Sequence, residues 1–406
     1  MADLKERSAE TDIGNKKSRS FLIYFILLYA TTYMANAVYN TFIPVYLKSL
    51  SLTGTLIGAL LSLGPLVAVF SQPIWGITGD RAKSKNDVLK ILVAGSGIAI
   101  IIFPLSTNVI FLFIIITAFT FFQSSVNPLS DAITLEQLEG SGFRFGHIRL
   151  AGTLGFAAMS VLAGTIINKK SSNMFLLYFA ITLLVFFTVT RLPVVKGHQS
   201  EGRKMQMWEL FKNRELMLLI SLNFIIQATL GYYYSFFSIY FNQSGGNSAL
   251  LGVAMLISST SEIPFLLNAD KILARFGVKA VLIFSSLIVT LRWFLMYAVS
   301  GAHAMLAVNV LHGMTFIIFS YCMATYINNN VPKELRASGQ TLNALLCMCL
   351  ARIIGSFFGG ILSDMTSIKQ VFLYIALIDL ATSAVYCIIF LRQRKTVKHP
   401  TDPVAR

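Results

Sequence analysis

Residues 280–300 read AVLIFSSLIVTLRWFLMYAVS, an apolar stretch in which Arg292 is the single charge. About 20 such residues in a helix match the hydrocarbon thickness of a lipid bilayer. A second apolar stretch, MLAVNVLHGMTFIIFSY at residues 305–321, contains His312. A charge inside a membrane helix costs roughly 2.5–3.5 kcal/mol on insertion scales, so ionisable groups there need a partner or a task. The two stretches therefore predict membrane-spanning helices that carry functional side chains.

The composition of the whole chain is that of a membrane protein. Hydrophobic residues make up 55% and charged residues 13%, whereas soluble domains contain about 25% charged residues. Apolar segments of spanning length recur along the chain, which predicts an all-α membrane protein with twelve transmembrane helices in two six-helix bundles. We place the spans at residues 21–47, 54–75, 88–106, 108–134, 146–168, 173–191, 216–241, 248–268, 279–300, 304–329, 339–363 and 370–391.

Lysines and arginines gather at alternate connections between these spans. Those connections are residues 1–19, 76–90, 191–214, 269–279, 331–338 and the C-terminal tail. The opposite connections contain only Lys48, Lys169, Lys170 and Lys369. Because basic connections stay in the cytoplasm, this asymmetry predicts a multi-pass plasma-membrane protein with both termini cytoplasmic. It also accounts for the net charge of +15 without a nucleic-acid partner.

The sequence lacks the motifs of nucleotide hydrolysis and of metal or serine catalysis. Gly-x-x-x-x-Gly-Lys, His-Glu-x-x-His and Gly-x-Ser-x-Gly are all absent. The cysteines all fall in predicted spans, where we expect buried thiols rather than metal ligands: Cys322, Cys347, Cys349 and Cys387. We therefore expect no enzyme activity, no cofactor and no metal site.

The longest polar connection divides six predicted spans from six. It defines an N-terminal bundle at 1–192, a cytoplasmic linker at 193–215 and a C-terminal bundle at 216–406. Residues 205–216 of this region are either a short amphipathic helix on the membrane surface or part of a solvated connection.

The turns after the second span of each half resemble each other, because each has an acid followed by bases. Such an echo indicates two parallel repeats. The first turn, GITGDRAKSK at 76–85, resembles the signature loop of the major facilitator superfamily, Gly-x-x-x-Asp-Arg/Lys. The resemblance implies that Gly76, Asp80 and Arg81, with Asp270 in the second half, latch the state in which the cytoplasmic side is closed. The alternative is a generic basic connection that sets topology.

Ionisable groups recur within the predicted spans. They are Asp131, Glu262, Asp379, Arg149, Arg292, Arg352 and His312. Six unpaired charges would cost roughly 15–20 kcal/mol by the insertion scale. We therefore expect the acids and bases to pair in a water-accessible cavity between the halves. Arg352 and Asp379, on the last two spans, are expected to form a structural pair with each other.

Asp131 and Arg149 are the first candidate pair. Asn127 precedes Asp131 by one helical turn, so the two share a face. Residues 142–156, GFRFGHIRLAGTLGF, resemble a segment of the lactose permease group of proton symporters, in which an arginine and an upstream acid grip the substrate. The resemblance implies that Asp131 and Arg149 bind the solute through bidentate hydrogen bonds. A structural ion pair near the cytoplasmic end of the bundle is the alternative.

Other residues complete the expected substrate site. Phe156 stands where that group has a sugar-stacking tryptophan, and Tyr39 takes a cavity position by the same resemblance. Asn36 lies on the same span as Tyr39. The glycines that follow Arg149, including Gly152, predict a close approach to a second helix.

Glu262, Arg292 and His312 are the candidate proton-coupling cluster. The lactose permease group has an arginine and a histidine at the separation found between Arg292 and His312, and histidine titrates near neutrality. A buried structural histidine is the alternative. In that group an acid follows this histidine by three residues, whereas here the position is Thr315. The seventh span, LGYYYSFFSIYF, also lacks the acids of the group. Lactose-type specificity and the proton route of the group are therefore not implied.

These observations together predict a proton-coupled symporter of a small polar solute such as a saccharide or nucleoside. A broader branch of the superfamily, which includes nucleoside and aromatic-acid symporters, shares the same skeleton. We expect a monomer whose partners are the solute, the proton and the lipid bilayer. The alternative is an exporter or uncoupled facilitator of aromatic compounds, favoured by the 12% aromatic content. A membrane receptor is a third interpretation, but the chain has no large extramembrane domain.

Overall fold

The computed structural model describes residues 2–138, 143, 145–197 and 210–397. Within these residues, 12 helices are long and apolar enough to cross a membrane, and no strand is present. The prediction of twelve spans is confirmed, although several helices are longer than expected. Of the possible helix at residues 205–216, residues 205–209 lie outside the described residues, and the last three residues belong to α9.

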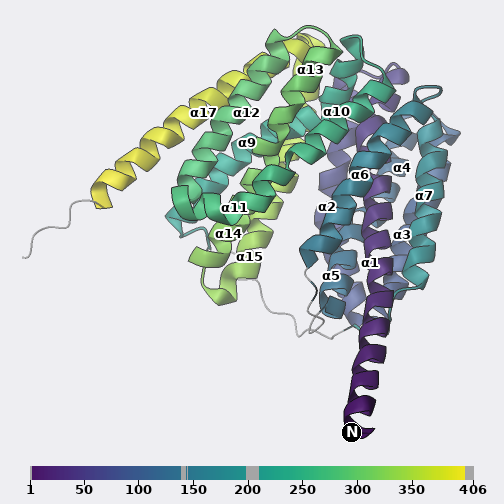
Figure 1. Cartoon of the computed structure of the whole chain (residues 1–406). Helices are drawn as coiled ribbons and strands as arrows, with labels where there is room; N and C mark the ends of the chain where they lie inside the picture. The colour runs from purple at the N-terminus through teal and green to yellow at the C-terminus, as the bar shows by residue number, and fades with distance from the viewer. Residues whose placement is uncertain (1, 139–142, 144, 198–209, 398–406) are drawn as a thin grey trace, which may run out of the picture.

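The helices form two bundles that lie side by side (Figure 1). The N-terminal bundle contains α1 (Ala2–Ser49), α2 (Gly54–Arg81), α3 (Lys85–Ile102), α4 (Val109–Gln123), α5 (Val126–Leu138), α6 (Phe145–Ile167) and α7 (Asn173–Thr190). The C-terminal bundle contains α9 (Arg214–Gln243), α10 (Ser248–Ser261), α11 (Ile263–Phe276), α12 (Val278–Ala298), α13 (Ala302–Asn309), α14 (Phe316–Asn330), α15 (Arg336–Asn343), α16 (Ala351–Met365) and α17 (Ile368–Val397).

Short polar side chains start several of these helices. Thr53, Ser84, Asn213 and Asn247 each accept a hydrogen bond from a backbone N–H in the first turn of α2, α3, α9 and α10, respectively. Such caps satisfy donors that have no partner inside the helix. The start of each of these four helices is thus set by a capping residue in the sequence.

Interruptions within the C-terminal spans lie next to the candidate charges. Pro264 stands in the first turn of α11, so the span breaks at Glu262 between α10 and α11. His312 lies in a 3₁₀ turn at Val310–Met314. A π-helical segment, Ala344–Leu350, joins α15 to α16 just before Arg352. Such π segments are frequent at functional sites because they redirect the side chains that follow.

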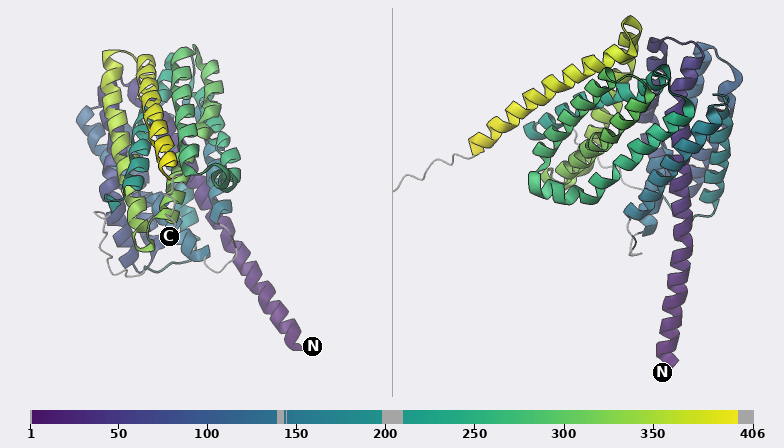
Figure 2. Two further views of the ribbon diagram at one scale, coloured as in Figure 1. Left: turned by 90° about the vertical axis from the view of Figure 1, so that its left-hand side faces the viewer. Right: turned by 45° about the horizontal axis from the view of Figure 1, so that its top comes forward.

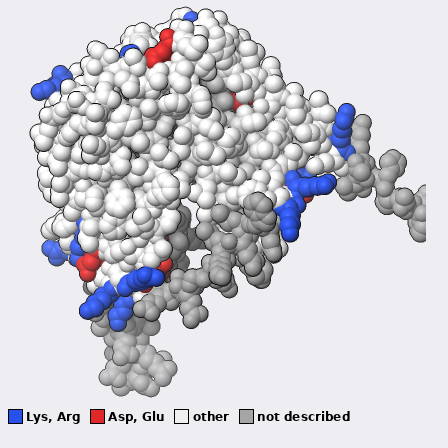
Figure 3. All heavy atoms as spheres, turned by 180° about the vertical axis from the view of Figure 1, so that it is seen from behind, with Lys and Arg blue, Asp and Glu red and all other residues white. Residues whose placement is uncertain are grey.

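Both ends of the described chain lie toward the same end of the molecule, beyond which α1 projects (Figure 2). Most of the Lys and Arg side chains visible in Figure 3 gather toward this end. We call it the basic end; it includes Arg81 at the end of α2 and Arg214 at the start of α9. The opposite end, which includes the turns before α2 and after α16, is called the closed end.

At the closed end the two bundles pack helix against helix. The α2 helix lies on α16, and α6 lies on α10. Gly58 of α2 faces the backbone carbonyl of Ser356, and Gly360 of α16 faces that of Gly54, so neither glycine has space for a Cβ atom. Small residues at such crossings let helices approach closely within a membrane. At the basic end the bundles diverge (Figure 1), and α5, α14 and α15 make their packing contacts within their own bundle.

A side chain of one bundle caps a helix of the other at the closed end. The carboxylate of Asp364 on α16 accepts hydrogen bonds of 2.7 Å from the backbone N–H groups of Gly54 and Thr55. The Thr55 hydroxyl donates a third, also of 2.7 Å. The free N–H groups and the helix dipole at the start of α2 both favour a carboxylate there. Asp364 therefore stabilises the closed end directly.

Replacing Asp364 by alanine is expected to loosen the closed end. Loss of a helix cap costs about 1 kcal/mol, which corresponds to an opening about fivefold more frequent. The measurement is the alkylation rate of a cysteine placed at the buried position Ile57, after the native cysteines are removed. Asp87→Ala is the control, because Asp87 lies in the first turn of α3 and pairs with Lys90 in its own bundle. Equal rates in the two variants would contradict the prediction.

Candidate functional site

Asp131 and Arg149 lie together in the N-terminal bundle. Arg149 Nη1 is 3.9 Å from Asp131 Oδ1, and the Tyr29 hydroxyl donates a hydrogen bond to the same carboxylate. The Arg149 guanidinium also lies over the ring of Tyr33, 4.7 Å from its centre. The two charged side chains remain 37% and 45% exposed, respectively. The pair is thus assembled by α1, α5 and α6 but is still accessible to a solute.

Glycines on α6 explain why α1 comes so close to this pair. A Cβ atom at Gly152 would meet the ring of Tyr33, and one at Gly155 would meet the backbone of Ala30. The predicted close approach is therefore confirmed, and it places the Tyr33 ring beneath Arg149. Tyr29 and Tyr33 are one helical turn apart on α1, which is the signal that could have identified both.

Asn127 and Phe156 lie on the same two helices as the pair. Asn127 is half-buried on α5, one turn before Asp131. Phe156 is half-buried on α6, two turns after Arg149, and so lies on the same side of that helix. Both residues thus lie on the helix sides that carry the pair, one turn from Asp131 and two turns from Arg149.

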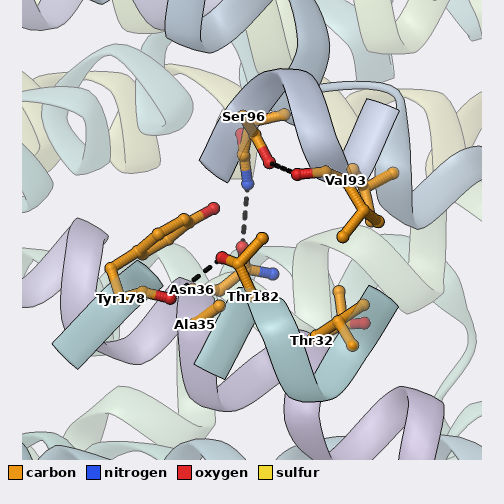
Figure 4. Close-up of a pocket in the computed structure, with 10 residues that line it drawn as sticks. Thr32, Ala35, Asn36, Val93, Ser96, Tyr178 and Thr182 are labelled. Carbon is orange, nitrogen blue, oxygen red and sulfur yellow. Dashed lines mark hydrogen bonds between the residues drawn. The ribbon is translucent and has the colours of Figure 1, made fainter. Parts of the chain in front are cut away.

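Asn36 and Tyr39 do not join this site. Asn36 points into a small pocket inside the N-terminal bundle (Figure 4), where its Oδ1 accepts a 2.8 Å hydrogen bond from Gln123 Nε2. Tyr39 packs against the rings of Phe119 and Tyr178, at 4.3 Å and 6.3 Å between ring centres. A buried amide needs a hydrogen-bond partner, and Asn36 finds it within its own bundle. The placement of these two residues with Asp131 is therefore corrected.

In the C-terminal bundle, Glu262 and His312 form a pair. Glu262 Oε1 is 3.5 Å from His312 Nε2. The break between α10 and α11 presents the acid, and the 3₁₀ turn presents the histidine. Gly313 makes this contact feasible, because a Cβ atom there would overlap the backbone carbonyl of Ser261. Both breaks in the helices thus serve to bring these two side chains together.

Arg292 does not contact Glu262, contrary to the expected cluster of three. Its Nη2 donates a 3.1 Å hydrogen bond to Asn309 Oδ1. Its guanidinium lies over the rings of Tyr233 and Trp293, 4.1 Å and 4.9 Å from their centres. Nε and Nη1 have no hydrogen-bond partner, although the side chain is fully buried. The aromatic rings hold Arg292 away from the acid.

The expected pair between Arg352 and Asp379 is also absent. Asp379 is fully buried and accepts hydrogen bonds from Thr229 Oγ1 at 2.9 Å and Trp293 Nε1 at 3.0 Å. Arg352 instead donates to Gln227 Oε1, at 3.2 Å from Nη2 and 3.4 Å from Nε. Gln227 and Thr229 are two residues apart on α9 and point to different sides of it. The two charges thus lie on different sides of one helix.

Among the described residues, Asp80 of the signature loop pairs within the N-terminal bundle. Asp80 Oδ1 is 3.9 Å from Lys85 Nζ, which also bonds Glu136 Oε2 at 2.8 Å. Arg81 is exposed, and a Cβ atom at Gly76 would meet no other atom within 4 Å. In the second half, Asp270 accepts a 2.5 Å hydrogen bond from the hydroxyl of Tyr321. The latch role stays a prediction for the state in which the basic end is closed.

The start of the linker is bound to the signature loop, a contact that the sequence did not reveal. The backbone oxygen of Val195 accepts a 2.8 Å hydrogen bond from Lys85 N. The Asn86 side chain donates to Pro193 O at 2.9 Å and accepts from Val195 N at 3.0 Å. The backbone N–H of Gly197 donates to Ala82 O at 3.0 Å. Hydrogen bonds thus join the signature loop to the start of the linker.

The two acid–base pairs face one another across the divide between the bundles. Ser160 of α6 lies against Gly252 of α10 and Gly164 against Ser248, so the start of α6, with Arg149, and the end of α10, with Glu262, lie on the same side of this crossing. On the far side, Tyr234 is 37% exposed and packs edge-on to His312, 6.1 Å between ring centres. Two interlocked helical bundles with charged pairs at their shared interface define a multi-pass membrane transporter.

Comparison with known proteins agrees with this class. The model described as MFS_1 like family matches residues 20–374, and the chain belongs to this family of the major facilitator superfamily. It is 24% identical to the maltose permease of Geobacillus stearothermophilus, over 91% of this chain and 95% of that protein. It is 25% identical to the uncharacterized transporter YwbF of Bacillus subtilis (strain 168), over 82% of this chain and 84% of that protein. The crystal structure of the nucleoside transporter NupG covers 91% of this chain and 99% of that chain, with a TM-score of 0.80 and 20% identity.

Proposed function

We propose that this protein is a secondary active transporter that couples the movement of a saccharide or nucleoside to that of protons by alternating access. The observation that carries the proposal is the pairing of Asp131 with Arg149 and of Glu262 with His312 across the divide between bundles joined at one end. We assign the basic end to the cytoplasm because basic connections stay there, and on that assignment the structure is the state open to the cytoplasm. One chain supplies both halves of the site, and the transporter works as a monomer.

Asp131 and Arg149 are assigned to the solute. The carboxylate accepts and the guanidinium donates, so the pair matches the two kinds of hydrogen bond that a sugar hydroxyl makes. The Tyr33 ring beneath Arg149 fixes the guanidinium and offers an apolar face to a sugar or base ring. Relatives named as maltose and nucleoside permeases support this solute class.

Glu262 and His312 are assigned to the proton. Glu262 Oε1 and His312 Nε2 are 3.5 Å apart, and a carboxylate and an imidazole can both take up and release a proton as the transporter changes state. Thr315, at the position where the lactose permease group has an acid, donates its hydroxyl to the His312 carbonyl at 2.6 Å. Glu262 is thus the acid that lies next to the histidine.

Glu262→Gln is expected to abolish accumulation driven by a pH gradient, because glutamine cannot exchange a proton. Exchange of labelled for unlabelled solute is expected to persist, since it needs no net proton movement. The measurement is uptake of labelled maltose and uridine into proteoliposomes, with and without an inward proton gradient. The control is Glu215→Gln, which removes an acid paired with Lys279 at 2.7 Å at the basic end. Gradient-driven accumulation that is unchanged in Glu262→Gln would rule out the proton role.

An uncoupled facilitator or exporter of aromatic compounds is the second candidate. The exposed ring of Tyr234, next to Phe316 at 6.4 Å between ring centres, favours it. Exchange of an aromatic solute that is independent of pH would support this function over the first.

A further inference from the structure

The two arginines inside the predicted spans of the C-terminal bundle have no acidic partner among the described residues. Arg352 bonds only the neutral amide of Gln227 and lies over the rings of Tyr234 and Phe316, 5.1 Å and 5.3 Å from their centres. Arg292 bonds only the amide of Asn309. Nitrogen atoms of both guanidinium groups are left without a hydrogen bond.

The acids of the spans are already bound to other groups. Asp131 is paired with Arg149, Glu262 with His312, and Asp379 with Thr229 and Trp293. Aromatic faces and amides offset part of the cost of a buried cation, but they supply no opposite charge. A membrane protein keeps an uncompensated charge at such a depth where it serves function. None of the described acids therefore supplies the counter-charge, which leaves this position open to an anion from outside the chain.

Arg352 is the arginine that a ligand can reach. It is half-buried, whereas Arg292 is fully buried behind Tyr233. Its Nε and Nη2 are held by Gln227, which leaves Nη1 without a hydrogen bond among the described residues. The neighbouring Tyr234 ring is exposed and also contacts His312, so an anion at Arg352 lies close to the proposed proton pair.

We propose that Arg352 is an anion-binding residue of the solute site and that the solute bears a carboxylate, as a sugar acid or a nucleoside-derived acid does. The inference rests on the proposed function and narrows its solute class. Gln227 positions the guanidinium, and Arg292 adds positive potential without contact. A monoanion that enters with one proton carries no net charge, so transport depends on the pH gradient and is insensitive to membrane potential.

The test compares matched acids and neutral analogues on purified full-length protein. The pairs are glucuronate with glucose, 3-phenylpropionate with 3-phenylpropanol, and uridine 5′-carboxylate with uridine. Binding is measured by the shift in melting temperature with ligand concentration. At least one acid is expected to bind about tenfold or more tightly than its partner, as a charge-assisted hydrogen bond requires.

Variants at Arg352 and Gln227 distinguish loss of anion binding from a general loss of protein stability. Arg352→Gln is expected to reduce the preference for the acid to below about twofold, and Arg352→Lys to retain part of it. Gln227→Glu supplies a resident carboxylate to Arg352 and is expected to remove the preference while keeping the protein folded. The matched control is Arg191→Gln, because Arg191 is exposed and lies over Phe187, 5.1 Å from the ring centre, outside the site.

The results that would contradict the anion subsite differ from the results that would contradict proton-coupled transport. If no acid binds more tightly than its neutral partner, or if the preference survives in Arg352→Gln, the anion subsite is wrong. Neutral maltose or uridine that is still accumulated under a proton gradient would then leave the proposed function intact. An acid preference that depends on Arg352, without gradient-driven uptake, would instead support the subsite and contradict the coupling.

Discussion

Arg149→Gln is expected to lower solute uptake by more than about 100-fold while the protein still folds. In the wild type the guanidinium lies beside Asp131 and over Tyr33, yet remains accessible. Hydrogen bonds to a charged group are worth about 1.5–3 kcal/mol each. Loss of a bidentate contact therefore costs about 3 kcal/mol, or a factor of more than 100 in affinity. Folding is preserved because Asp131 keeps the hydrogen bond from Tyr29.

The measurement is initial uptake and solute binding in the same preparation. Asp131→Asn is expected to cause a comparable loss, and the double variant to lose little more, because the two residues act as one unit. Arg275→Gln is the control, since this exposed arginine lies over the ring of Phe276 on α11. Wild-type uptake in Arg149→Gln would mean that the pair is structural.

The sequence was sufficient for the spans and for one pair in each bundle. The length of the apolar segments and the positions of Lys and Arg between them predicted the twelve helices, because the thickness and charge of the bilayer determine both. The resemblance to the lactose permease group, in which an acid precedes the arginine at the spacing of Asp131 and Arg149, indicated that these two residues act together, and the structure places them in contact.

The predictions that were wrong concern which side of a helix a charged side chain lies on. Arg352 is half-buried and Asp379 is fully buried, and their hydrogen-bonding partners, Gln227 and Thr229, point to different sides of α9. Arg292 lies over the rings of Tyr233 and Trp293. In the sequence these aromatic residues cannot be distinguished from ordinary residues of an apolar span. Counting opposite charges along a sequence assumes that each finds the other, and the rotation of each helix decides whether it does.

The Asp364 cap escaped prediction for another reason. It joins α16 to α2, which are far apart in sequence and meet only when the closed end is shut. An acid at the end of an apolar span has the appearance of an ordinary polar connection. A sequence encodes contacts of both transport states, and nothing in it assigns a residue to one of them.

Gly58→Trp is expected to prevent closure of the closed end and to shift the transporter to the opposite state. Gly58 lies against the backbone of Ser356, whose hydroxyl donates a 3.1 Å hydrogen bond to the Gly58 carbonyl. An indole there overlaps the main chain of α16, which cannot rotate away as a side chain can. Overpacking of this kind costs about 1–3 kcal/mol or more, which reduces the closed population by about 5- to 150-fold.

The measurement is the distance between spin labels at Lys83 and Lys333, which are exposed on different bundles at the basic end. The native cysteines are removed first. The distance is expected to be long in the parent and to shorten in Gly58→Trp, because the basic end closes as the other end opens. Gly64→Trp is the matched control, since it places the same side chain on α2 where no atom lies within 4 Å of the added Cβ. An unchanged distance in Gly58→Trp, or an equal change in both variants, would show that the contact between α2 and α16 does not control the exchange between states.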